Sequence, residues 1–416
     1  TAVPQSDGTL NVFIGSGQSL VVGGAVLGLD ATASPDDPAN LELALVTDNA
    51  TIPLPSSIFQ GGKLGGLLAF RDQTLDKAQN TFGRVVTTLA QTFNDQHRLG
   101  QDLNGALGTD YFRVPQPSVQ ARSTNLGDGV LTATIDDATQ LSVSDFRVTY
   151  SGGNWTVRRL PEGTENVYGS LPQTFDGITL DLPSGTPQDG DMYLVQPTRY
   201  AGRDIDVLVT DPALVAAAAP VRTTAALTNN GNAKITQGVV SDVTDLPLPS
   251  PVTFTYDQAA NEWAVSGASP AAGPFTYTSG ADITFNGLTF QITGTPADGD
   301  SFTLSNNNQG VADNRNALLL GRLQTTPTVA GGSANYQSAY SQLVSQVGND
   351  TREIEVQSQA QQILVKTATD AEQAFSGVNL DEEAANLVRF QQAYQASAKV
   401  LQIATDLFDQ ILQFGN

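Results

Sequence analysis

Apolar residues recur at alternating steps of three and four along the last stretch of the chain, residues 380–412. No Pro or Gly interrupts this stretch, and three acidic residues stand at its start, so the pattern predicts one long helix. Ser397 is the one polar residue in the stripe. Such a stripe requires a partner helix, from the same domain or from another molecule. Its apolar members are Leu387, Phe390, Tyr394, Leu401, Ala404, Phe408 and Ile411.

Two earlier stretches share the same helical period. Residues 67–98 carry apolar residues at steps of three and four, and Gly100 follows as a stop signal. From Tyr336 to Phe375 a similar spacing holds for nearly the whole stretch. We therefore assign residues 57–112 and 311–380 to one discontinuous helical rod domain, and residues 381–416 to a separate C-terminal helix.

The rest of the chain has the pattern of β-structure. Short runs of β-branched and aromatic residues alternate with Gly, Asp, Asn and Pro, which favours strands joined by turns. Residues 1–56 form one such region, which leads into the rod. Residues 113–310 form another, which interrupts the rod in sequence. The predicted fold class is therefore α+β and multidomain, a rod or bundle of long helices with all-β modules inserted.

An internal repeat divides the inserted region into two modules, residues 113–205 and 206–310. The recognisable copies start at Thr124 and Thr228 and contain the two Trp residues of the chain at matching places. Each copy should be a compact β unit with one buried Trp. The matched pairs are Tyr150 with Tyr256, Trp155 with Trp263, Phe175 with Phe285, and Tyr193 with Phe302.

Two local patterns lead to further expectations within the modules. Each copy contains an Asp-Gly-Asp triplet, at residues 189–191 and 298–300, which is typical of a β-hairpin turn. Between the copies, Asp211-Pro212 precedes a run of small residues that ends before Pro220. Because Asp is a good cap and Pro is favoured in the first turn, this run predicts a short helix.

Composition excludes several classes of function. The 416 residues carry a net charge of −22, and nucleic-acid binding requires a basic surface instead. There is no Cys, and His97 is the one His, so no catalytic or metal-binding constellation is available, and we expect neither enzyme activity nor a cofactor. No apolar run is long enough to insert in a membrane, and no cleavable signal peptide is present.

Longer motifs resemble a known family. The segment NLDEEAANLVRFQQAYQASAKVLQ is similar to the C-terminal signature of bacterial flagellar axial proteins. Two further segments, GGKLGGLLAFRDQTLD and AQTFNDQHRLGQDLNG, resemble the hook-associated proteins of the FlgK type. The resemblance is strong over residues 59–112 and 311–414 and loose in the β modules. It implies that the chain is the C-terminal part of a longer protein.

The resemblance also implies a function. Such proteins are exported without a cleaved signal peptide and join hook to filament in the extracellular flagellum. They self-associate in a ring and contact the hook protein and the second junction protein, and an export chaperone holds the C-terminal helix before secretion. By resemblance, the residues that bind these partners are Leu387, Phe390, Tyr394, Leu401, Phe408 and Ile411.

Two alternatives remain open at this point. A secreted adhesin or carbohydrate-binding protein would also have tandem acidic β modules, and an exposed aromatic strip across them would favour it. A hydrolase carried by an axial protein would require a motif such as HExxH, which the sequence lacks.

Overall fold

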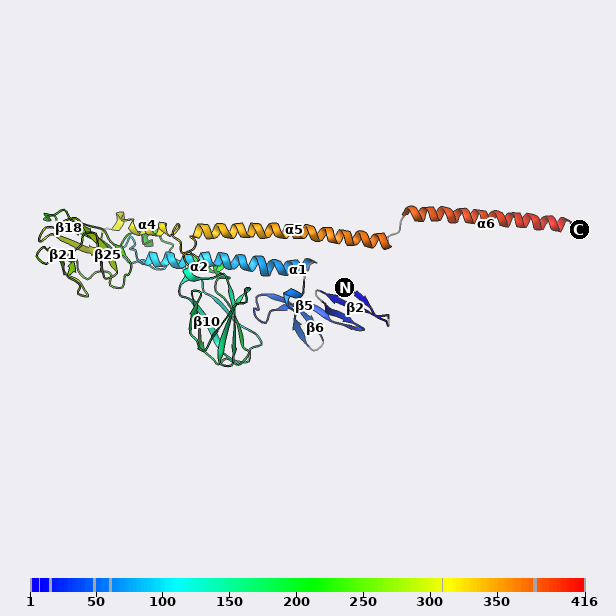
Figure 1. Ribbon diagram of the computed structural model, residues 1–416, viewed down its shortest axis with the longest axis horizontal. Coiled ribbons are helices and arrows are strands. Elements are labelled where there is room, and N and C mark those ends of the chain that lie inside the picture. Colours follow the sequence, from blue (N-terminus) through cyan, green and yellow to red (C-terminus); the bar gives the residue numbers. More distant parts are fainter. Residues whose placement is uncertain are drawn as a thin grey trace. The chain divides into compact units, whose positions relative to one another are not determined.

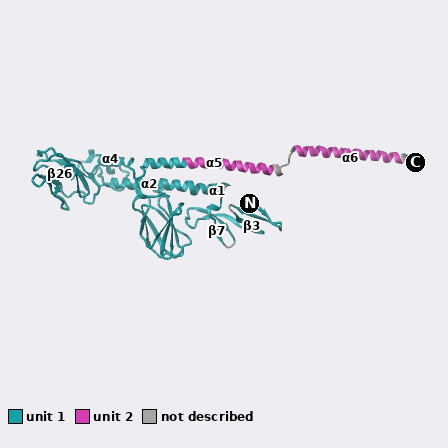
Figure 2. Cartoon of the chain, in the orientation of Figure 1, with its two compact units in different colours: residues 1–347 teal, residues 348–416 magenta. Residues whose placement is uncertain are grey.

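The computed structural model describes residues 2–6, 8–14, 17–47, 50–59, 62–308, 310–376 and 380–414. The chain divides into two compact units, residues 1–347 and 348–416, and the division falls inside one helix (Figure 2). The described strands all belong to the first unit, and the second consists of helix (Figure 1). This α+β arrangement with several separate sheets confirms the predicted fold class.

Two small antiparallel sheets form the first part of the chain, as the pattern of residues 1–56 predicts. Leu45, Leu54 and Phe59 form their core, and Leu68 from the first helix packs against it. This contact ties the N-terminal sheets to the helical part. The first sheet contains β1 (Ala2–Pro4), β2 (Leu10–Ile14), β3 (Gln18–Val22) and β4 (Ala25–Val26), and the second contains β5 (Gly28–Ala33), β6 (Leu41–Val46) and β7 (Thr51–Pro53).

The helix predicted near residues 67–98 starts earlier than expected. After the 3₁₀ turn η1 (Ser56–Ile58), the chain runs through α1 (Gly62–Ala69), the π-helical segment η2 (Phe70–Leu75) and α2 (Asp76–Arg98). These three elements follow one another without a break. Gly100 follows α2 where no larger residue fits, because a Cβ there would lie 2.5 Å from the carbonyl oxygen of Ala216.

Module 1, residues 113–205, is built from two facing antiparallel sheets. The larger has the order β13-β12-β11-β16-β9 and the smaller the order β10-β15-β14. Its 3₁₀ turn η3 (Ala138–Gln140) and short helix α3 (Ala201–Asp204) contact α2. The strands are β9 (Ser118–Ala121), β10 (Val130–Ile135), β11 (Asp145–Ser151), β12 (Asn154–Leu160), β13 (Glu165–Tyr168), β14 (Gln173–Phe175), β15 (Ile178–Ser184) and β16 (Met192–Gln196).

Module 2, residues 206–310, repeats this topology. Its larger sheet has the order β23-β22-β21-β26-β18, and in the smaller one β25 pairs with β19, β20 and β24. The repeat therefore includes β9 and β18, which precede the matched sequences. The strands are β18 (Val221–Ala225), β19 (Lys234–Ile235), β20 (Val239–Val240), β21 (Val252–Asp257), β22 (Glu262–Ser266), β23 (Phe275–Thr276), β24 (Asp282–Phe285), β25 (Leu288–Thr293) and β26 (Ser301–Asn306).

The two Trp residues occupy the same place in the two modules. Trp155 pairs with Tyr150 across β12 and β11, and Trp263 pairs with Tyr256 across β22 and β21. Both Trp side chains are buried in the core between the sheets. The ordered match in the sequence therefore reflects a shared fold.

The prediction of hairpin turns at the two Asp-Gly-Asp triplets was wrong. Each triplet joins strands that belong to opposite sheets, β15 to β16 and β25 to β26. The second Asp of each triplet turns inward and accepts backbone hydrogen bonds. Asp191 accepts from Leu126, Gly127 and Gln188, and Asp300 accepts from Asn230, Gly231 and Ala297. These carboxylates tie the loop that precedes the smaller sheet to the turn between the sheets.

The prediction of a helix between the modules was also wrong, except for one turn. Asp211 caps a 3₁₀ turn, η4 (Pro212–Leu214), by accepting from the Ala213 N–H, but the chain then extends. Ala218 exchanges two backbone hydrogen bonds with Gln101. Because the backbone groups of this segment bond to other parts of the chain, they are not available for a helix. Shortly before this segment, β17 (Asp206–Val207) pairs with β8 (Phe112–Arg113) in a short antiparallel ribbon.

The chain returns to helix after module 2, as predicted. A 3₁₀ turn, η5 (Gly310–Ala312), and α4 (Arg315–Arg322) come first, followed by α5 (Tyr336–Ser376) and α6 (Leu380–Phe414). Val85 of α2 and Ala339 near the start of α5 share a buried cluster, and the Thr92 and Tyr336 hydroxyls hydrogen-bond. Helix α2, which precedes the β modules, therefore contacts the start of α5, which follows them, within the first unit.

Candidate assembly surface

Helix α6 carries the stripe singled out in the sequence, and the structure leaves it uncovered. The six residues expected to bind partners are each between 61% and 77% exposed. All six lie on one face, because their steps of three and four follow the helical period. The structure thus brings these residues together on one continuous surface. These residues are Leu387, Phe390, Tyr394, Leu401, Phe408 and Ile411.

Sequence reasoning missed two apolar residues of α6 outside this stripe. Val388 and Ile403 are each about half exposed, at 50% and 51%. They follow Leu387 by one position and Leu401 by two, so they lie on the far side of the helix from the stripe. The sequence contained the signal that could have identified them, since both residues are apolar and stand outside the period of the stripe. Apolar side chains on both sides suit a helix that packs among several others, rather than one that covers a single core.

The charge of α6 is small in a strongly acidic protein. After the first turn, which contains Asp381, Glu382 and Glu383, two basic and two acidic side chains balance one another. The acidic first turn stabilises the helix, because the N-terminal end of the helix dipole favours negative charge. The remainder of the surface can therefore approach another acidic chain without large repulsion.

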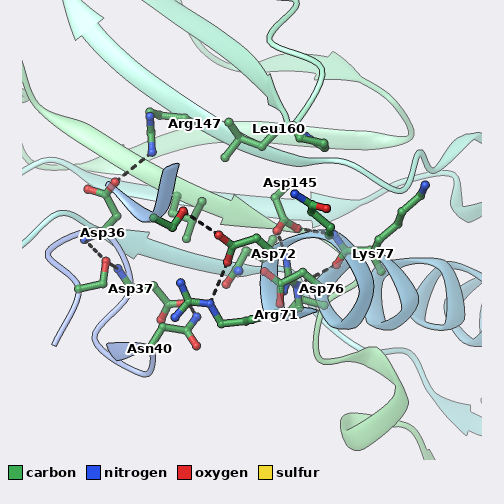
Figure 3. Close-up of a pocket in the computed structure, with 18 of the residues that line it drawn as sticks. Asp36, Asp37, Asn40, Arg71, Asp72, Asp76, Lys77, Asp145, Arg147 and Leu160 are labelled. Atoms are coloured by element: carbon green, nitrogen blue, oxygen red, sulfur yellow. Dashed lines mark hydrogen bonds and ion pairs between the residues drawn. The ribbon is translucent and has the colours of Figure 1, made fainter. Parts of the chain in front are cut away.

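A cleft lies elsewhere in unit 1, between the β5–β6 loop, the start of α2 and module 1 (Figure 3). It has a volume of about 740 Å³ and is lined by more acidic than basic side chains. Arg199 forms ion pairs with Asp76 of α2 and Asp145 of β11, and its side chain is 8% exposed. Burial raises the pKa of both carboxyls above the ordinary value, and Arg199 opposes that rise.

On the other side of the cleft, Asp36 of the β5–β6 loop binds module 1. Its carboxylate lies 3.2 Å from Arg122 and 3.2 Å from Arg147. Asp72 likewise accepts hydrogen bonds from Ser56 and Arg71. Since these carboxylates are held by partners within the chain, the cleft is an ionic joint between three parts of unit 1. Among the described residues, no group of three or more His, Asp or Glu is placed to bind a metal.

His97 is buried at the end of α2 and is fully engaged. Its Nδ1 lies 2.6 Å from the Thr109 carbonyl oxygen, and its Nε2 accepts from the Ala216 N–H at 2.9 Å. Both ring nitrogens are therefore used to fasten the end of α2 to the segment between the modules. His97 therefore has a structural role. This agrees with the sequence, which contains no Cys and no second His that could form a catalytic or metal-binding site with it. None of the described helices has the length and apolarity required to cross a bilayer.

Family models match three parts of the chain. Residues 1–112 match the "Flagellar hook-associated protein FlgK helical domain", and residues 120–197 match the "Flagellar hook-associated protein 1, D2-like domain". Residues 373–414, which include α6, match the "Flagellar basal body rod FlgEFG protein C-terminal" model. The matches thus cover the N-terminal sheets with the first helices, module 1 and the C-terminal helix.

Individual relatives extend the similarity over nearly the whole chain. The chain is 30% identical over 414 residues to flagellar hook-associated protein 1 of Escherichia coli, and 31% identical over 415 residues to that of Salmonella typhimurium. These alignments cover 98% of the chain and 59% and 60% of the relatives, so the chain spans about 60% of their length.

A solved structure shows the same fold. The flagellar hook junction protein FlgK from Burkholderia pseudomallei matches with a TM-score of 0.82 and 33% sequence identity. The match covers 90% of this chain and 74% of that structure. The similarity therefore includes both sequence and three-dimensional arrangement.

Proposed function

Because the chain belongs to the family of the flagellar hook-associated protein FlgK, we propose that it is a structural component of the bacterial flagellum that joins hook to filament. The observation that carries this proposal is the uncovered apolar stripe of α6. Each β module encloses a buried apolar core, whereas the stripe of α6 presents six large apolar side chains to water. A helix of this kind is stabilised when other helices cover its stripe.

The stripe can supply a large part of the assembly free energy. Each large apolar side chain contributes roughly 1.5–3 kcal/mol when it becomes fully buried. An isolated helix in water is marginal, because helix nucleation is unfavourable and packing supplies most of the stability. We therefore propose that α6 packs among helices of neighbouring copies in a ring, of the hook protein and of the second junction protein.

Export without a signal peptide and capture by a chaperone belong to the same proposal. An exposed stripe would aggregate or pair prematurely before assembly, so a chaperone that covers Leu387 to Ile411 has a physical reason to exist. We also propose an extracellular location, which membership of a flagellar family supports. The proposals on export and on location concern the whole protein. This chain spans about 60% of the length of its relatives.

We further propose that residues 113–205 and 206–310 are self-contained modules that take no part in the axial contacts. Among their described residues, no aromatic side chain is exposed, since each ring is buried or half-buried. A carbohydrate-binding surface would require such rings, so no observation favours the adhesin alternative. The proposed domain division places these modules between the two parts of the helical rod, residues 57–112 and 311–380, and leaves residues 381–416 for assembly.

The proposal is tested in cells that lack the gene and receive variants of the full-length protein. We expect electron microscopy of the deletion strain to show hooks without filaments. Leu401→Asp and Phe408→Asp should each fail to restore filaments, because each introduces a charge into the stripe. Val167→Asp is the matched control, since Val167 is 64% exposed but lies in module 1. Filaments in the deletion strain, or full rescue by both α6 variants, would contradict the proposal.

A further inference from the structure

The ionic joint contains one carboxylate more than its buried arginine can neutralise. Arg199 pairs with Asp76 at the start of α2 and with Asp145 of β11, and the two carboxylates lie beside one another (Figure 3). The side chains of Arg199 and Asp145 are each 8% exposed, and that of Asp76 is 29% exposed. Because a guanidinium carries one positive charge and each carboxylate one negative charge, the group is negative when both carboxyls are ionised. We call these three residues the Asp–Arg–Asp triad.

The charged groups around the triad leave this negative charge in place. Arg71 and Arg147 each pair with another carboxylate, and Arg203 of α3 pairs with its neighbour Asp204. Lys77 is exposed, so water screens its charge. Acidic side chains outnumber basic ones along the cleft beside the triad. The charged residues of that lining are Asp36, Asp37, Glu42, Arg71, Asp72, Asp76, Lys77, Asp145, Arg147, Glu162 and Arg199.

The two carboxyls of the triad differ in their hydrogen bonds. Asp145 also accepts from the Asn80 Nδ2 at 3.0 Å, and the Asn80 Oδ1 accepts from the Arg199 Nε at 3.1 Å. Among the described residues, Arg199 is the one side chain that donates to Asp76. A proton on Asp145 would weaken the acceptor for Asn80, whereas a protonated Asp76 keeps a carbonyl oxygen that accepts from Arg199. The triad therefore holds a proton best on Asp76.

The proton affinity of the triad sets the sign of its pH dependence. Burial raises the pKa of both carboxyls and outweighs the opposing effect of Arg199, and Asp72 adds to the rise at Asp76. In an open joint water surrounds these groups, and their pKa returns to the ordinary value near 3.8. The closed joint therefore binds a proton more tightly than the open joint does. The stabilisation of the closed joint by the proton is complete below the ordinary value and is lost as pH rises through the raised values.

Closing of the joint fixes one end of module 1 on α2. Arg199 stands just before α3, and Gly202 of α3 packs so closely on Phe82 of α2 that a Cβ at this glycine would lie 2.6 Å from the ring. The Thr198 hydroxyl donates to the Asn80 carbonyl oxygen at 3.1 Å. Because the triad lies between these two contacts and the cleft, its separation also separates α3 from α2.

A second attachment of module 1 to α2, at the turn η3, is made by uncharged groups. The Thr88 hydroxyl donates to the Ala138 carbonyl oxygen at 2.8 Å, and the Gln91 Nε2 donates to the Asp136 backbone carbonyl oxygen at 3.2 Å. Neither contact includes an ionisable group, so a change of pH does not act on it directly. The η3 attachment therefore serves as a reference for the α3 attachment within the same molecule.

We propose that the Asp–Arg–Asp triad is an ionic lock that a proton stabilises. Closing of the joint takes up one proton, which Asp76 holds, so module 1 is bound more firmly to α2 in mildly acidic solution than at neutral pH. An exposed ion pair behaves in the opposite way, because protonation of its carboxylate removes the attraction. In the triad, Asp145 still neutralises Arg199 after Asp76 is protonated.

Hydrogen exchange measures the opening of module 1 at both attachments. Backbone N–H groups at residues 203–205, in and after α3, and at residues 140–141, in and after η3, are hydrogen-bonded and exchange when their segment opens. Protection factors, in which the pH dependence of intrinsic exchange cancels, are compared at about pH 7 and about pH 5. We expect protection at α3 to rise severalfold at the lower pH and protection at η3 to stay unchanged. Equal protection at α3 at both pH values, or the same rise at η3, would overturn the proposal.

Three substitutions separate this lock from an ordinary ion pair. Asp76→Asn imitates the protonated side chain, so we expect it to raise protection at α3 severalfold at neutral pH and to abolish the response to pH. Asp145→Asn should lower that protection, because Arg199 and Asn80 lose their charged acceptor. Glu162→Gln removes a charge from the same cleft outside the triad and is the control, which should change neither property. Reduced protection at α3 in Asp76→Asn would contradict the proposal.

Circular dichroism of each variant shows whether the β modules remain folded. If Asp145→Asn does not fold, the comparison of Asp76→Asn with the unmodified chain decides by itself. All of these measurements concern the joint within unit 1. None of their outcomes depends on the flagellar role, so the two proposals can fail separately.

Discussion

The β modules and α6 use apolar residues in opposite ways. Trp155 and Trp263 are 4% and 0% exposed inside their modules, whereas Leu401 of α6 is 70% exposed. Two facing sheets enclose a core without help, because each covers the apolar face of the other. A single helix with an apolar stripe cannot do so. The difference teaches that each module is stabilised by its own core, whereas the stability of α6 depends on what it binds.

The contrast between the modules and α6 is tested first at the two Trp residues, where we expect the largest loss of stability. Trp263→Ala and Trp155→Ala should each lower the free energy of unfolding of their own module by roughly 3–5 kcal/mol, because each removes a large buried side chain. Denaturant unfolding followed by circular dichroism measures the change. Val167→Ala, at an exposed position of module 1, is the control. A loss below about 1 kcal/mol for both Trp variants would mean that the modules do not depend on these cores.

The inward carboxylates of the two modules should give a smaller and matched effect. Burial acts to raise the pKa of Asp191 and of Asp300, but hydrogen bonds from three backbone N–H groups each outweigh it and hold both pKa values below the ordinary one. Asp191→Asn and Asp300→Asn should each cost roughly 1–3 kcal/mol, since buried N–H groups lose their charged acceptor.

The sign of the pH dependence follows from the same shift. A carboxyl with a lowered pKa in the folded state contributes stability that is present above the ordinary pKa near 3.8 and lost as pH falls through the lowered value. Unfolding measured between pH 5 and pH 2 should therefore show this loss in the unmodified chain and a weaker one in each Asn variant. If one module responds and the other does not, the equivalence of the two triplets is wrong.

Much of this architecture could be predicted from the sequence, because the signals are local or repeated. The helical periods gave α2, α5 and α6, and the ordered match around Trp155 and Trp263 gave two modules of one fold. The contacts of the ionic joint could not be predicted. Asp76, Asp145 and Arg199 are far apart in sequence, and only the folded chain brings them together.

The wrong predictions have a common cause. An Asp-Gly-Asp triplet specifies a tight turn, but whether that turn joins neighbours in one sheet or crosses between two sheets depends on the tertiary fold. The small-residue segment after Pro212 has helical signals, yet Ala218 pairs with Gln101 instead. In both places, long-range backbone hydrogen bonds outweighed the local preference.

The smallest expected change in stability is the one that matters most. Removing residues 384–416 deletes the whole stripe of α6, which makes no buried contact in the described chain. The measurement compares the truncated and full-length proteins in two ways, by the unfolding of the β modules and by filament attachment in cells. We expect unfolding to be unchanged and filament attachment to be lost. If the modules unfold more readily without α6, or if filaments still form, α6 is ordinary core and the assembly role is wrong.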